Sequence, residues 1–109
     1  MNAQTTKLRA LRRALIEAGI RSLDQQAATL GLPRSTTHMI LGGGQHKWSG
    51  LHVRLVARML SASLPPAARQ ILIDYVTERS RGDYGHDKQV CDRFAARLAA
   101  LRGGESEAA

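Results

Sequence analysis

The sequence has one cysteine, three prolines and few aromatic side chains, which make up 4% of its 109 residues. Because Cys91 has no second cysteine to pair with, no disulfide can form within the chain, and nothing indicates an oxidising compartment. No run of about 18 apolar residues is present, so we expect no membrane span. Arginines interrupt every apolar run near the N-terminus, which argues against a signal peptide. These absences predict a cytoplasmic protein.

Patterns typical of metal sites and catalytic centres are missing as well. No CxxC or HxxxH pair is formed by the candidate metal ligands, which are His46, His52, His86 and Cys91. There is no phosphate-binding glycine loop, no recognisable Ser-His-acid arrangement and no pair of carboxylates beside a histidine. We therefore expect no cofactor, no metal and no enzymatic activity, and we interpret Cys91 as a small buried residue of the last helix.

Apolar residues recur at helical spacing in six stretches that glycine, proline and serine separate. No alternation of apolar and polar residues persists long enough to predict a strand. The sequence therefore predicts an all-α fold, a compact bundle of about six helices. The expected helices cover about 6–18, 22–30, 33–41, 50–62, 66–81 and 87–102. We expect Thr5 or Thr6 to cap the first helix, Ser49 to cap the fourth and Gly103-Gly104 to end the last.

The formal net charge of +7 lies entirely in the N-terminal half. Residues 1–60 carry nine basic and two acidic side chains, whereas residues 61–109 carry seven of each. An excess of positive charge on one part of a chain favours contact with a polyanion, although basic residues also serve simply to keep a small protein soluble. Four of these cations are spread around the first expected helix, namely Lys7, Arg9, Arg12 and Arg13, and could extend an electrostatic surface.

The segment 23–42 predicts two short helices joined by a tight turn. Ser22 and Gln25 have the spacing of a capping box, and Gly31 suits the left-handed backbone that ends a helix. Ala27 is small where the two helices would cross. Apolar residues flank the turn and are expected to face the core: Leu30, Leu32, Ile40 and Leu41. This is the geometry that presents a second helix to the major groove of DNA.

With the helix expected at 50–62, this segment resembles the lambda-repressor-like family, also called Xre or Cro-like. The resemblance covers about residues 6–62 and rests on Ala27, Gly31 and the run Leu-Gly-Leu-Pro-Arg-Ser-Thr at 30–36. Two positions depart from the family pattern, because Gln26 and Thr37 stand where apolar residues are usual. The resemblance implies a helix-turn-helix at the second and third helices, and a repressor of the phage or mobile-element type that binds double-stranded DNA as a homodimer.

The resemblance also implies which residues meet DNA. Arg34, Ser35 and His38 are expected to read bases from the second helix of the motif, where arginine can bind guanine O6 and N7. Contacts to phosphate are expected from Ser22, Gln25, Thr36, Gln45, His46 and Lys47. The only tryptophan, Trp48, is interpreted as an anchor of the loop after the motif.

We expect residues 1–62 to form the DNA-binding region, residues 63–102 a C-terminal helical pair in the same compact unit, and residues 103–109 a flexible tail. The apolar stripes of residues 66–102 predict a dimer contact, a completed monomer core, or a surface for another protein, as in an antitoxin. RNA binding is a further alternative, against which the scattered aromatic residues argue because they form no stacking platform.

Overall fold

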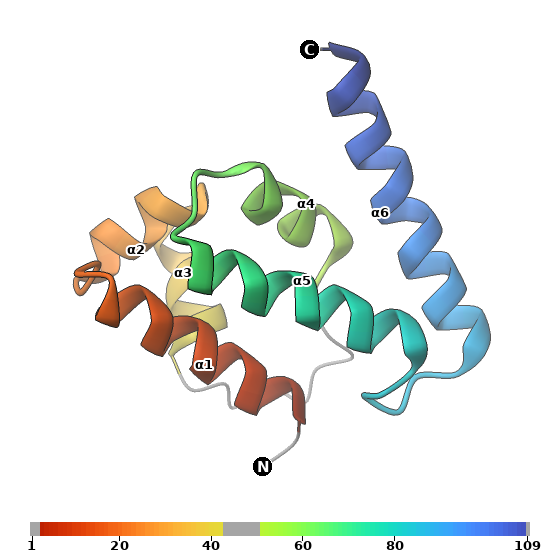
Figure 1. Cartoon of the computed structure of the whole chain (residues 1–109), viewed down its shortest axis with the longest axis horizontal. Coiled ribbons are helices and arrows are strands. Elements are labelled where there is room, and N and C mark those ends of the chain that lie inside the picture. Colours follow the sequence, from red (N-terminus) through yellow and green to blue (C-terminus); the bar gives the residue numbers. More distant parts are fainter. Residues whose placement is uncertain (1–2, 43–50, 109) are drawn as a thin grey trace.

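The computed structural model describes residues 3–42 and 51–108, with side chains as far as residue 103. Within these residues the chain forms six α-helices and no strand (Figure 1), which confirms the predicted all-α bundle. The helices are α1 (Ala3–Glu17), α2 (Leu23–Leu30), α3 (Arg34–Leu41), α4 (Val53–Ser61), α5 (Pro66–Arg81) and α6 (Lys88–Ala108).

The helices pack around one core. α1 lies along α5, α3 packs on α1 and α2, and α6 packs on α4 and α5. α2 and α6 stand at opposite ends of this array (Figure 1). The radius of gyration is 13.5 Å, close to the value of about 13 Å expected for a compact domain of this length. The largest fully buried side chains come from each of the helices α1 to α5 and from the segment before α4, among them Leu11, Leu30, Leu51, Met59 and Tyr75.

α1 begins at Ala3, three residues before the predicted start, so neither Thr5 nor Thr6 is its cap. The first turn is held by a tertiary contact, because the buried side chain of Gln4 accepts a hydrogen bond from the hydroxyl of Tyr75 at 2.9 Å. This contact joins residues 71 positions apart, so no local sequence pattern predicts it.

α4 begins at Val53 and not near residue 50, and its N-cap is His52 in extended conformation. The expected cap, Ser49, lies outside the described residues. The backbone of Leu51 is bound on both sides by α5: its N–H donates to Tyr75 Oη at 2.9 Å, and its carbonyl accepts from Arg79 Nη1. Because these bonds hold Leu51 outside the helix, α4 starts only after it.

α6 continues through Gly103 and Gly104 to Ala108, so the helix stop predicted at these glycines is wrong. The flexible tail predicted for residues 103–109 stays a prediction. A glycine stops a helix when its backbone turns left-handed, as Gly31 and Gly82 do at the ends of α2 and α5. Gly103 has no positive φ and remains helical. Glycine in a helix costs about 1 kcal/mol relative to alanine, which weakens the last turns of α6 without forbidding them.

Candidate nucleic-acid interface

The turn between α2 and α3 is fixed by local hydrogen bonds. Ser22 Oγ accepts from the N–H of Gln25 at 3.0 Å, and Gln25 Oε1 accepts from the N–H of Ser22 at 3.1 Å, which completes the predicted capping box. At the other end, Gly31 adopts φ 73°, and the N–H of Leu32 donates to the carbonyl of Ala27 at 3.1 Å. Three residues then separate the two helices, so α3 is presented at a defined angle to α2.

The inner face of the helix-turn-helix motif is buried as predicted, and the two polar residues on it, Gln26 and Thr37, are hydrogen-bonded. Gln26 is 4% exposed and donates from Nε2 to the carbonyls of Ile20 and Arg21. Thr37 is fully buried and donates to the carbonyl of Pro33 at 3.0 Å. A buried polar group with its hydrogen bonds made costs little, so both residues fit the interface between the helices.

The three predicted base-reading residues share the outer face of α3. Arg34, Ser35 and His38 are all exposed, and Arg34 and His38 lie one helical turn apart. Met39 stands beside them with 41% of its surface exposed. The structure therefore brings together a guanidinium, a hydroxyl and an imidazole on the exposed face of α3.

The predicted phosphate-contacting residues divide into three groups. Ser22 and Gln25 are exposed at the N-terminus of α2, where backbone N–H groups and the helix dipole favour an anion. Thr36 is half-buried on α3. Gln45, His46 and Lys47 lie outside the described residues, as does Trp48.

Two adjoining grooves flank the C-terminal end of α3, and arginine lines both. One, of about 260 Å³, contains Arg12, Arg21 and His38, with Gly42 at its edge. The other, of about 520 Å³, lies along α1 and contains Arg9, Arg12 and Arg13. Arg12 thus joins the exposed cations of α1 to the outer face of α3.

Arg21 is a residue that sequence reasoning overlooked as a candidate contact. It directly precedes the capping residue Ser22, and this position could have indicated it, because a cation beside an anion-binding helix N-terminus adds to the positive potential that attracts the anion. Lys7, in contrast, does not add to the positive charge of the exposed face of α1, because its Nζ is ion-paired with Oε2 of Glu78 on α5 at 3.2 Å. Its role is to join α1 to α5.

Three further observations concern metal ligands, membrane spans and Cys91. Among the described residues, no group of three or more histidine, cysteine, aspartate or glutamate side chains is placed to hold a metal ion. No helix in these segments is long and apolar enough to cross a membrane. Cys91 is buried in α6, as predicted, with its thiol 3.6 Å from the carbonyl of His86.

Comparisons of the chain with protein-family models, with curated proteins and with solved structures give no match.

Proposed function

We propose that this protein binds double-stranded DNA in a sequence-specific manner and regulates transcription as a homodimeric repressor, with α3 lying in the major groove. The observation that carries the proposal is the outward face of α3, where Arg34, Ser35 and His38 stand exposed beside the arginine-lined grooves. The major groove of DNA admits an α-helix, and arginine can bind guanine there through two hydrogen bonds.

The charge of the surrounding surface supports the same docking. The exposed N-terminus of α2 and the arginines of α1 flank α3, so a duplex over α3 would meet N–H groups and guanidiniums at its phosphates. We also propose that Lys47 contacts phosphate, because it follows α3 in the chain. Such contacts set the register of the protein, while α3 supplies the base contacts.

A homodimer is part of the proposal because α3 is only eight residues long, and proteins of this type bind two half-sites about one helical turn apart. The apolar stripes of α5 and α6 mostly serve the monomer core, since Leu72, Tyr75, Phe94 and Leu98 are buried within it. Ile73 and Val90 are the large apolar residues that these two helices leave exposed among the described residues. This burial weakens both the dimer contact and the antitoxin-like partner surface predicted for residues 66–102, because either would need an exposed apolar surface there.

Selection of binding sites from a random pool of duplex DNA, at low and near-physiological salt, tests the proposal. We expect enrichment of a palindrome with half-sites about 10 base pairs apart. Salt-sensitive binding without an enriched sequence would contradict sequence-specific recognition. Equal competition by RNA would contradict the choice of duplex DNA as the partner.

A further inference from the structure

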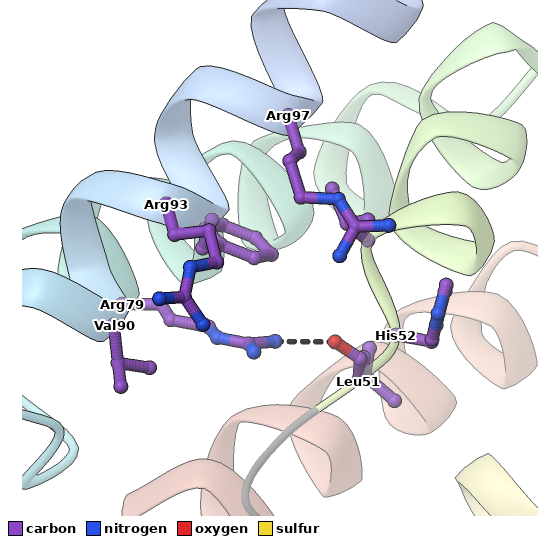
Figure 2. Close-up of a pocket in the computed structure, with 8 residues that line it drawn as sticks. Leu51, His52, Arg79, Val90, Arg93 and Arg97 are labelled. Carbon is purple, nitrogen blue, oxygen red and sulfur yellow. Dashed lines mark hydrogen bonds between the residues drawn. The ribbon is translucent and has the colours of Figure 1, made fainter.

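A cationic cleft lies between α6, α5 and the start of α4, away from the surface described above. It measures about 240 Å³ and is lined chiefly by Leu51, His52, Arg79, Arg93, Phe94 and Arg97. Figure 2 shows the guanidinium groups of Arg93 and Arg97 directed from α6 into this space, with Arg79 and Leu51 below them and His52 on the opposite side. No carboxylate is among the described residues that line the cleft.

Arg79 is a buried cation that has no acidic partner among the described side chains. It is 9% exposed, its Nη1 donates to the carbonyl of Leu51 and to Tyr75 Oη at 3.2 Å, and its Cζ lies 4.0 Å from the centre of the Phe94 ring. Its Nε is buried and has no hydrogen-bond partner in the described parts of the chain. A buried charge is costly unless an opposite charge or a full set of hydrogen bonds compensates it. Two neutral oxygens and the Phe94 ring therefore compensate the buried charge of Arg79 only in part.

Arg93 and Arg97 add two more positive charges one helical turn apart on α6. Like charges at this spacing repel one another, and neither residue forms an ion pair among the described residues. The acidic side chains of α5, of α6 as far as Gly103 and of the loop between them form hydrogen bonds outside the cleft. Asp74 accepts from Gln70, Glu78 from Lys7 and Tyr84, Asp83 from Arg81, Asp87 from the N–H of Val90, and Asp92 from Lys88. Within the part of the chain whose side chains are described, this cleft therefore holds cations and no counter-charge.

We propose that this cleft is a binding site for a small phosphate-bearing anion. Guanidinium groups match the tetrahedral oxygens of phosphate with charge-assisted, paired hydrogen bonds. Nδ1 of His52 accepts from the N–H of Arg54 at 3.1 Å, so in the neutral ring the proton is on Nε2, which is a donor. The volume is below the range of about 300–1,000 Å³ typical of pockets for larger ligands, so the site fits the phosphate group and leaves the rest of a ligand outside.

The phosphate could belong to a free ligand or to the DNA backbone, and the position of the cleft favours a free ligand. α6 packs on α4 and α5, whereas α3 packs on α1 and α2, and α6 and α2 lie at opposite ends of the molecule (Figure 1). A duplex centred on α3 would thus approach a different part of the protein. The proposal does not depend on DNA binding by α3.

Titration calorimetry with inorganic phosphate, at ionic strength held constant with chloride, tests the site on the full chain. The parent protein should bind one phosphate per chain. Arg93→Gln and Arg97→Gln should each weaken this binding at least about tenfold, the loss expected for one charge-assisted hydrogen bond. Arg102→Gln is the matched control, since it removes the same charge from an exposed position of α6 outside the cleft, and it should bind phosphate as the parent does. Both test residues are exposed, so the variants should fold.

Absence of phosphate binding by the parent, or equal binding by Arg97→Gln and Arg102→Gln, would overturn the proposal. The salt dependence of duplex binding separates the two sources of phosphate. If Arg97→Gln lowers the salt slope by about one unit and Arg102→Gln does not, the cleft contacts the DNA backbone, and the assignment to a free ligand is overturned. An unchanged slope together with weakened phosphate binding supports it.

Discussion

Arg34 Nε lies 2.8 Å from Oδ1 of Asp24, so the first residue of α3 is ion-paired with the second residue of α2. Both side chains are largely exposed, at 68% and 79%, and an ion pair of this kind contributes only about 0.2–1 kcal/mol. A guanine or a phosphate can therefore displace Asp24 from Arg34 at small cost. The pair holds the guanidinium of Arg34 beside the first turn of α2.

Replacement of Asp24 by asparagine should strengthen binding to duplex DNA by up to about fivefold, because it releases Arg34 and removes a negative charge from the proposed interface. Fluorescence anisotropy with the selected duplex measures the effect. Asp92→Asn is the control, as Asp92 is paired with Lys88 on the exposed side of α6. An increase that persists unchanged when Arg34 is also alanine would show that Asp24 does not act through Arg34.

Arg34→Ala should cost about 1–3 kcal/mol of binding free energy for the selected duplex and relax the preference at one base pair. The reason is the loss of a paired hydrogen bond to a base, which a scrambled duplex does not offer. Affinities for both duplexes, measured at one salt concentration, test this. If the two affinities fall by the same factor, Arg34 contacts phosphate and does not read sequence.

Arg12→Gln should weaken binding to every duplex to a similar extent and lower the salt slope by about one unit, because Arg12 lines both grooves beside α3 and we propose that it contacts phosphate there. Lys7→Gln offers a contrast on the same helix, since Lys7 is bound to Glu78, and it should leave the slope unchanged. Equal slopes for the parent and Arg12→Gln would remove Arg12 from the interface.

Gly31→Ala should lower the free energy of unfolding by about 1–2 kcal/mol, because alanine is strained in the left-handed backbone at φ +73°. Its Cβ would meet only Ala62 Cβ at an ordinary 3.9 Å, so the cost comes from the backbone and not from crowding. Gly103→Ala should act in the opposite direction, by about 0.5–1 kcal/mol, since Gly103 is helical with open space around it. Chemical denaturation of both variants tests the pair, and a destabilised Gly103→Ala would argue against a continuous α6.

Tyr75→Phe should destabilise the fold by about 1–3 kcal/mol, since it leaves the buried N–H of Leu51 and the buried amide of Gln4 without their shared partner. Tyr84→Phe is the comparison, because the hydroxyl of Tyr84 donates to Glu78 in a half-buried setting where water can replace it. We expect Tyr84→Phe to lose less stability than Tyr75→Phe. Thermal unfolding of the two variants under the same conditions decides the order, and a reversed order would contradict the role assigned to Tyr75.

The fold class and the turn between α2 and α3 were predictable because they depend on neighbours in the chain. The capping box joins Ser22 to Gln25, and the left-handed Gly31 bonds back to α2, all within five residues. The spacing of apolar residues likewise placed Leu30, Leu32, Ile40 and Leu41 in the core. The phosphate contacts predicted at Gln45, His46 and Lys47 lie outside the described residues, so they stay predictions.

The sequence by itself determined the six helices, the turn of the motif and the outward face of α3, since hydrogen bonds and side-chain periodicity within a few residues carry this information. Only the tertiary structure decided where α1 and α4 begin, which basic side chains are ion-paired and which side chains line the same cleft. Lys7 meets Glu78 and Gln4 meets Tyr75 across 71 residues, and Arg79 reaches Leu51 across 28. Contacts at such separations depend on how whole helices pack, because each is made only after the core has brought distant segments together.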